Sequence, residues 1–318
     1  MNLLDIYKEL NTEAKCLAFL EHMRWPGGVK CLSCESLRIT PLISKGKRNK
    51  KTGKVGPDRH LYQCNECRFQ FTATTGTVYH DTHLPLAKWF LAIALITESK
   101  KGISANQLAR ALGVQYRTAW YLAHRIRKSM IETNPPKMTG IVEVDETYVG
   151  GKQRGRQNKN KNKEIVIGIR ERGGPLRYEQ VPDNKADTVY QVIADNVDKN
   201  VQAIMTDESR IYDFKLTQYK DVRHGRIRHK SKIYVQGDVH TNTVESAFSL
   251  FKRGIMGAFH KLSLKHMHRY LAEFEFRFNN RKALDLFGMT VRRLALAGNL
   301  PYAQLVEENA FTPFIRPK

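Results

Sequence analysis

Four cysteines near the N-terminus have the spacing of zinc ligands. They form two C-x-x-C pairs, namely Cys31 with Cys34 and Cys64 with Cys67. One tight turn can present both thiolates of a pair, and two such turns complete a tetrahedral zinc site. The residues between the pairs suit a strand hairpin. The pattern therefore predicts a zinc ribbon in which Zn²⁺ is structural and contributes roughly 10–16 kcal/mol of folding free energy.

Other uses of these cysteines are less well supported. A redox dithiol is disfavoured because neither pair opens a helix of a thioredoxin-like βαβ unit. His60 and His80 could serve as substitute ligands, although four cysteines already fill the shell. The fifth cysteine, Cys16, lies among apolar residues and fits a small buried side chain. Such a ribbon could bind DNA or contact another protein, and the residues do not separate the two.

Three acidic residues lie at positions where a carboxylate is unexpected unless it has a function. Asp145 lies within an apolar strand pattern, Asp207 ends another apolar run, and Glu245 opens a helix. A buried carboxylate is costly unless it is paired or binds a cation. Three such groups can hold two Mg²⁺ or Mn²⁺ ions, which suits in-line displacement at phosphorus. Lys252 lies two turns after Glu245 on the same helix face, where its ammonium could reach a phosphate.

Neighbouring acids compete for these roles. The competitors are Glu143, Glu146 and Glu208. Glu143 is the strongest of them, because residues two apart on a strand share one face and it therefore lies on the same side as Asp145. The alternative for Asp145 and Asp207 is that they are capping or loop-edge acids without chemistry.

The charge balance indicates a polyanionic partner. The 318 residues include 53 Lys+Arg against 31 Asp+Glu, a formal net charge of +22. Nucleic acid is the simplest such partner. A membrane surface is disfavoured, because the chain shows neither a basic amphipathic helix nor a lipidation signal, and its longest apolar run is too short to span a bilayer. The N-terminus lacks the pattern of a signal peptide, so we expect a cytoplasmic protein with reduced thiols.

A helix-turn-helix pattern follows the cysteines. Residues 85–99 have helical periodicity, a capping box begins at Ser104, and Gly113 marks a turn before a helix over 115–130. In this layout the start of the last helix meets base edges and its later basic residues meet phosphates. The expected DNA contacts are Gln115, Tyr116, Arg117 and Thr118 for bases, and Arg125, Arg127 and Lys128 for phosphates. The alternative is an ordinary three-helix bundle with a solvated basic face.

Two further basic stretches could contact a DNA backbone. Residues 152–163 carry six Lys or Arg and no acid, with Lys152, Arg154 and Arg156 at the start. Residues 223–232 combine arginine, lysine and histidine. Solvated loops are the commoner explanation of such runs, but beside the acids we favour phosphate contact.

The second half of the chain predicts a mixed α/β core. Strands are expected over 141–149, 164–169 and 203–205, and helices over 186–197, from 244 onward and over 266–281. Pro135 and Pro136 mark the boundary before it. The predicted organisation is an N-terminal helix (1–23), the zinc ribbon (24–82), the helix-turn-helix domain (83–133), a linker (134–139), the catalytic core (140–285) and a C-terminal tail (286–318).

The chain resembles bacterial insertion-sequence transposases of the ISXO2-like kind, from about residue 20 to 285. The motifs that support this are the cysteine pairs, Leu84-Pro-Leu-Ala-Lys-Trp89, Val144-Asp-Glu-Thr-Tyr-Val-Gly-Gly-Lys152, Thr206-Asp207, and His240-Thr-Asn-Thr-Val-Glu245 followed by Lys252. The resemblance implies an RNase H-like core, in which a mixed sheet is flanked by helices. It also implies a metal-binding triad of Asp145, Asp207 and Glu245, with Lys252 as the accompanying basic residue.

The expected activity is cleavage and joining of DNA. The partners would be double-stranded terminal repeats and target DNA, and two ends held together imply a homodimer or a larger synaptic assembly. One rival is a catalytically silent, transposase-derived regulator, which would bind DNA without cutting it. A second rival is an RNase H-like nuclease or resolvase, which would hydrolyse DNA without joining it.

Overall fold

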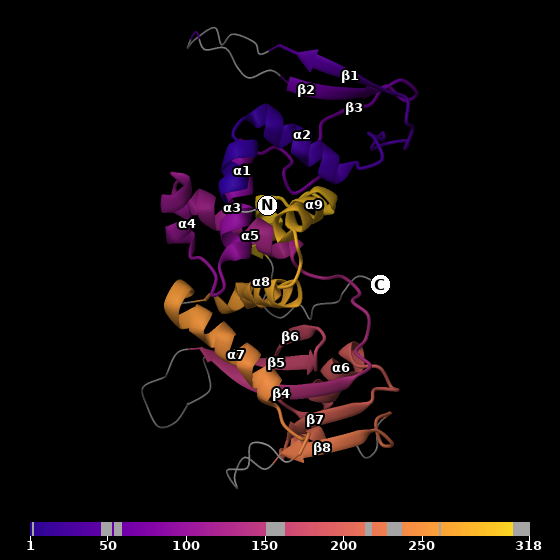
Figure 1. Cartoon of the computed structure of the whole chain (residues 1–318), viewed down its shortest axis with the longest axis vertical. Coiled ribbons are helices and arrows are strands. Elements are labelled where there is room, and N and C mark those ends of the chain that lie inside the picture. Colours follow the sequence, from indigo (N-terminus) through magenta and orange to yellow (C-terminus); the bar gives the residue numbers. More distant parts are fainter. Residues whose placement is uncertain are drawn as a thin grey trace. The chain divides into compact units, whose positions relative to one another are not determined.

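The computed structural model describes residues 1, 3–45, 53, 59–150, 163–213, 218–227, 237–260 and 262–307. The chain divides into two compact units. Figure 1 shows the whole chain, coloured by position in the sequence. The first unit comprises 1–95 with 285–301, and the second comprises 96–284 with 302–318. This division differs from the predicted domains, because part of the predicted tail joins the zinc-ribbon unit and the predicted helix-turn-helix is split from its first helix.

A small antiparallel sheet supports the cysteines in the first unit. Its strands lie in the order β1 (Ile39–Ser44), β2 (Arg59–Cys64) and β3 (Gln70–Phe71). Cys64 ends β2 and pairs in register with Ile39. Alternating apolar residues around the second cysteine pair predict β2 and β3, and both strands are present. The basic residues over 45–59 predict a loop between the two cysteine pairs, and most of this segment lies outside the described residues.

Helices form the rest of the first unit. They are α1 (Leu3–Glu9), α2 (Glu13–Arg24), most of α3 (Leu86–Glu98) and α9 (Leu286–Leu296). The predicted single N-terminal helix is therefore two helices. The hydroxyl of Thr12 accepts a hydrogen bond from the backbone N of Lys15 at 3.3 Å, which caps α2 and separates it from α1. None of the described helices has both the length and the apolar character needed to cross a membrane.

Two helices of the second unit meet at a tight glycine turn. They are α4 (Ala105–Leu112) and α5 (Tyr116–Ser129). The Ser104 hydroxyl accepts a hydrogen bond from the backbone N of Gln107 at 3.2 Å, so it caps α4 as predicted. Gly113 has φ 60°, a left-handed conformation that ends α4 at low cost only for glycine.

A five-stranded mixed sheet forms the centre of the second unit (Figure 1). The order is β6 (Leu176–Val181), β5 (Lys163–Glu171), β4 (Ile141–Gly150), β7 (Ala203–Asp207) and β8 (Arg223–Ile227). β4, β5 and β6 pair antiparallel, whereas β7 is parallel to both β4 and β8. The sequence predicts β4, β5 and β7 but misses β6 and β8, in which polar residues interrupt the apolar pattern of an edge strand.

Helices cover both faces of this sheet. α6 (Ala186–Asn196) packs on the face that contains Val142 and Val144, while α7 (Asn242–Gly254) and α8 (Met267–Asn279) pack on the other. Side chains alternate between the faces of a strand, so the odd-numbered acids of β4 lie on the α7 side. The remaining described elements are η1 (Arg210–Tyr212), the π-helix η3 (Ile255–Phe259), η4 (Leu264–His266) and α10 (Tyr302–Glu307).

Candidate functional site

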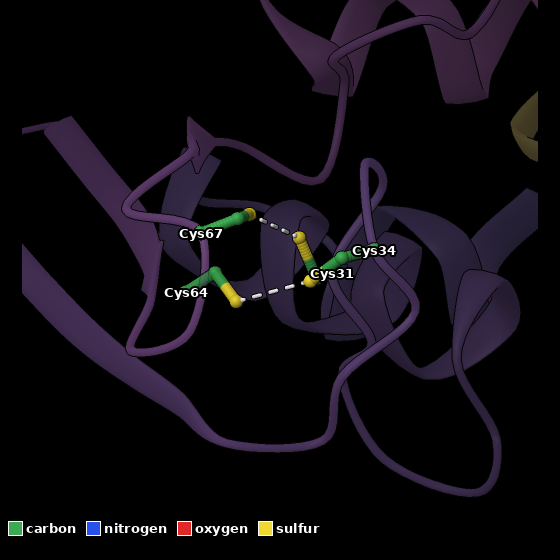
Figure 2. Close-up of side chains that lie close together, drawn as sticks. All are labelled: Cys31, Cys34, Cys64 and Cys67. Atoms are coloured by element: carbon green, nitrogen blue, oxygen red, sulfur yellow. Dashed lines mark hydrogen bonds between the residues drawn. The ribbon is translucent and has the colours of Figure 1, made fainter.

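The four cysteines converge into one site in the first unit. Figure 2 shows the side chains of the two pairs pointing toward one another, and all four sulfur atoms lie within 4.8 Å of each other. The distance is 3.5 Å from Sγ of Cys31 to Sγ of Cys67, and 3.5 Å from Sγ of Cys34 to Sγ of Cys64. Tetrahedral Zn²⁺ with Zn–S bonds of about 2.3 Å needs sulfurs roughly 3.8 Å apart, so the donor set fits zinc closely.

Backbone N–H groups favour thiolates in this site. Burial opposes ionisation of Cys31, but the N–H groups of Cys34 and Ser33 outweigh it and lower the pKa of Cys31 to about 6. The N–H groups of Cys67 and Glu66 likewise lower the pKa of Cys64. These backbone amides favour the thiolates of Cys31 and Cys64, whereas hydrogen bonds with the other three thiols raise the pKa of Cys34.

The acids expected to form a catalytic centre come together in the second unit. The β4–β7 register pairs Glu143 with Met205, and its continuation by two residues along each strand leads to Asp145 and Asp207. The charge of Asp207 raises the pKa of Asp145, so the two acids interact. Glu245 occupies the first turn of α7, the helix that packs on this face of β4. Residues far apart in the chain thus converge because two parallel strands and one helix meet at the same place.

A glycine lets α7 approach the acids closely. Gly168 on β5 is the register partner of Asp145. A Cβ atom at Gly168 would lie 2.6 Å from Cζ of Phe248 and 2.9 Å from Cγ2 of Val244. Only glycine therefore lets α7 pack this close to the sheet. A glycine within an apolar strand pattern is a signal of close backbone approach, and it could have identified this position from the sequence.

The other acids near Asp145 act on its ionisation. Burial, followed by the nearby carboxylates of Glu146, Glu245 and Asp207, raises the pKa of Asp145 to about 7. The backbone N of Glu146 donates to Oδ1 of Asp145 at 2.9 Å and opposes this shift. A cation would reverse the penalty on the ionised form, which is the behaviour expected of a metal-binding carboxylate.

The competing acids have different surroundings. Burial raises the pKa of Glu146, whose carboxylate accepts a hydrogen bond from the hydroxyl of the buried Tyr212. Glu143 is fully buried and is occupied by partners from α7 and from Arg172. Of the described residues, only the four cysteines form a tight group of candidate ligand atoms, and the acids around Asp145 are spread more widely.

Lys252 and the basic stretches fall in different settings. Lys252 is exposed in the last turn of α7. Lys152, Arg154 and Arg156 lie outside the described residues. Of the stretch over 223–232, residues 223–227 form the edge strand β8 instead of a loop, and its Arg223 pairs with Asp238 at 2.6 Å.

The start of α5 is exposed, as a DNA-reading helix requires. Gln115, Tyr116 and Arg117 are exposed, with Tyr116 at 51%, and Thr118 is half-buried. This exposed end immediately follows the turn at Gly113. The predicted base-contacting residues therefore lie at the surface.

The later basic residues of α5 do not fit the phosphate-contacting role predicted for them. Arg125 and Arg127 are only 4% and 1% exposed, because α8 covers this part of α5. The guanidinium of Arg125 stacks on Tyr121 at 4.9 Å, and Nε of Arg127 donates to the buried Glu273 at 2.6 Å. These two arginines hold the unit together, which helical periodicity alone does not reveal.

These two centres define a class of protein: a zinc-ribbon protein with an acid-bearing α/β core. Comparison with known proteins gives the family. Residues 137–279 match the ISXO2-like transposase domain, and residues 11–70 match the transposase zinc-ribbon domain. The two matches cover more than half of the chain, which belongs to the ISXO2-like transposases with a zinc ribbon.

A curated relative agrees with this assignment. The chain is 27% identical over 289 residues to an uncharacterized protein in transposable element ISH50 of Halobacterium salinarum. The aligned region covers 85% of this chain and 92% of that protein, so the similarity includes both compact units.

Proposed function

We propose that the chain is a DDE transposase that binds the terminal repeats of an insertion sequence, cleaves DNA and joins the freed end to a target. The observation that supports this most directly is the convergence of Asp145, Asp207 and Glu245 inside the domain that matches the transposase family. We also propose that the core is RNase H-like. Its sheet has three antiparallel strands, with two parallel strands added beside the first of them.

The three carboxylates would hold two Mg²⁺ or Mn²⁺ ions, which when bound activate an attacking oxygen and stabilise a leaving oxygen. In the first step water attacks the scissile phosphorus and the 3′ oxygen leaves with a proton as a 3′-OH. In the second step that hydroxyl attacks a target phosphodiester, forming one P–O bond while another breaks. Lys252, exposed on α7, would hold a DNA phosphate near the acids.

DNA recognition is proposed for the α4–turn–α5 pair. Gln115, Tyr116 and Arg117 would meet base edges, with Thr118 beside them, and Arg125 and Arg127 are left out because they are buried. Lys152, Arg154 and Arg156 remain proposed phosphate contacts. A homodimer or larger synaptic assembly is proposed because both transposon ends must be held during joining.

The test is a strand-transfer assay. Donor DNA carrying the sequences that flank the gene is incubated with the protein, Mg²⁺ and a target plasmid, beside Asp145→Asn and the exposed control Asp221→Asn. Metal-dependent joined products from the wild type and the control, absent with Asp145→Asn, would support the proposal. Retained cleavage by Asp145→Asn would move the centre to Glu143 or Glu146.

The same assay separates the rival functions. Specific binding to the flanking DNA without cleavage or joining would favour a transposase-derived regulator. Cleavage without joining would favour a nuclease or resolvase.

A further inference from the structure

Glu143 is a fully buried carboxylate two residues before Asp145 on the same face of β4. Its relative exposure is 0%. One of its oxygens, Oε2, accepts three hydrogen bonds from the start of α7. The donors are the backbone N of Thr243 at 2.9 Å, the hydroxyl of Thr243 at 2.6 Å and the backbone N of Val244 at 3.1 Å. A buried carboxylate is tolerated when its lone pairs are used in this way.

These bonds cap α7 from outside the helix. The first N–H groups of any helix lack partners within it, and an anion at that end is favoured by the helix dipole. The residue in the local capping position, Thr241, does not provide a side-chain cap. Its hydroxyl instead donates to Oε1 of Glu245 at 2.8 Å, so the local hydroxyl orients Glu245 while the strand carboxylate caps the helix.

The second oxygen of Glu143 is also occupied. Oε1 accepts from Nε of Arg172 at 2.7 Å and lies 3.1 Å from Nδ1 of His240. Arg172 further donates to the carbonyl oxygens of Asp238 at 2.7 Å and His240 at 2.9 Å. Arg170 donates to the carbonyl oxygen of Thr243 at 2.5 Å. The chain just before α7 and the first residues of α7 are thus held by three side chains. They come from β4 (Glu143), from β5 (Arg170) and from the turn after β5 (Arg172).

We infer that Glu143 is a positioning residue for Glu245. The group formed by Glu143, Arg170, Arg172 and Thr243, called here the α7 clamp, ties the first turn of α7 to the strand that bears Asp145. Glu245 follows Val244 directly. The clamp therefore fixes the rotation of α7 and its distance from the sheet at Glu245. This role rests on the proposed function, because it assumes that Asp145 and Glu245 bind the same ions.

The clamp also gives Glu143 a role distinct from that of a metal ligand. Both of its oxygens accept hydrogen bonds from protein donors, at 2.6–3.1 Å. Supporting groups of this kind typically change metal affinity about 10–100-fold when altered, whereas loss of a ligand removes binding more completely.

The test compares Glu143→Gln, Asp145→Asn and wild type in the full-length chain. Mn²⁺ binding is measured by calorimetry, and amide hydrogen exchange is followed in a peptide covering 242–248. For Glu143→Gln we expect faster exchange in that peptide and about tenfold weaker Mn²⁺ binding. Cleavage should recover most of its rate at saturating Mn²⁺. Asp145→Asn should keep the exchange pattern and lose Mn²⁺ binding.

Two further variants guard against misfolding of Glu143→Gln. The double variant Glu143→Gln with Arg172→Gln removes both charges and leaves no unpaired buried ion. Thr243→Val removes one hydroxyl donor with little change in shape and should give a smaller effect in the same direction. Glu13→Gln is the matched control, since Glu13 on α2 accepts from the backbone N of Leu86 at 3.0 Å and so caps α3 from another element. It should leave Mn²⁺ binding unchanged.

Three outcomes would overturn the inference. Faster exchange over 242–248 with unchanged Mn²⁺ affinity would make the clamp merely structural. Loss of Mn²⁺ binding by Glu143→Gln as complete as that of Asp145→Asn would make Glu143 a ligand. A wild-type chain that binds no Mn²⁺ would overturn the proposed function and the positioning role with it. The wild-type measurement alone reveals this outcome, before any variant is examined.

Discussion

The cysteine centre and the acidic centre are assembled in opposite ways. In the zinc ribbon each pair of ligands comes from one short turn, and only two turns must meet. In the core each acid comes from a different element, β4, β7 or α7. The cysteines already lie within 4.8 Å of one another, whereas the acids are more widely spread in the described structure.

This difference follows from what brings the ligands together in each centre. Thiolates on a tight turn are brought together by local backbone geometry, and the ion itself closes the site. Carboxylates repel one another, so a folded scaffold must hold them together before the ion arrives. We therefore expect the acidic centre to depend on the glycine that admits α7 and on the α7 clamp, whereas the cysteine centre depends on its two turns and the ion.

Zinc removal gives the largest expected effect. A strong chelator should unfold the ribbon, because structural zinc supplies roughly 10–16 kcal/mol in such domains. Hydrogen exchange should rise sharply over 59–71 and remain slow over β4 and β5 in the second unit. Cys34→Ser should reproduce the effect, and Cys16→Ser should retain the zinc. Simultaneous loss of protection in β4 would contradict the separate dependence of the two centres.

Loss of one acid should have the second-largest effect, on activity and not on the fold. Asp207→Asn should lower the rate of DNA cleavage on the order of 10³-fold or more, because the remaining acids cannot hold both ions. The circular dichroism spectrum and the zinc content should stay unchanged. A comparable loss of activity in the exposed control Asp221→Asn would show that the assay reports a general effect of charge.

Gly168→Ala tests the scaffold without touching a ligand. The new methyl group would overlap Phe248 and Val244 and displace α7, which should cost about 1–3 kcal/mol of stability and reduce Mn²⁺ affinity. Thermal unfolding and calorimetry measure the two effects. Gly27→Ala is the control, since nothing lies within 4 Å of its added Cβ atom. Unchanged Mn²⁺ affinity in Gly168→Ala would mean that the distance of α7 from the sheet does not affect ion binding.

The smallest expected effect is a pH dependence that belongs to the acidic centre. The folded pKa of Asp145, about 7, exceeds its ordinary value of 3.8, so the folded state binds this proton more tightly than the unfolded state. The resulting stabilisation is complete below about pH 4 and is lost as the pH rises through about 7. From pH 6 to pH 8 the metal-free chain should lose about 1.4 kcal/mol of unfolding free energy.

Chemical denaturation at several pH values measures this loss. Asp145→Asn should abolish it, and saturating Mg²⁺ should reverse its sign, because the ion binds the deprotonated carboxylate. An unchanged pH dependence in Asp145→Asn would assign the effect to other groups.

Much of the molecule was predictable because its signals are local. The C-x-x-C spacing predicts the cysteine centre, and the cap at Ser104 and the turn at Gly113 predict the start and end of α4. Apolar periodicity predicts the central strands of the core. The edge strands β6 and β8 were missed, since a strand whose outer neighbours are solvent or polar groups lacks a continuous apolar run.

The sequence by itself determined which side chains could be ligands and which segments with a strong apolar period would be strands or helices, because residue type, period and short spacing act within a few residues. Only the tertiary structure decided what the other polar residues do. Arg127 looks like a DNA contact on its helix but pairs with the buried Glu273 of α8, and Glu143 looks like a rival to Asp145 but caps α7. Both outcomes depend on partners a hundred or more residues away in the chain. The burial and hydrogen bonds that such partners impose arise only once the chain has folded.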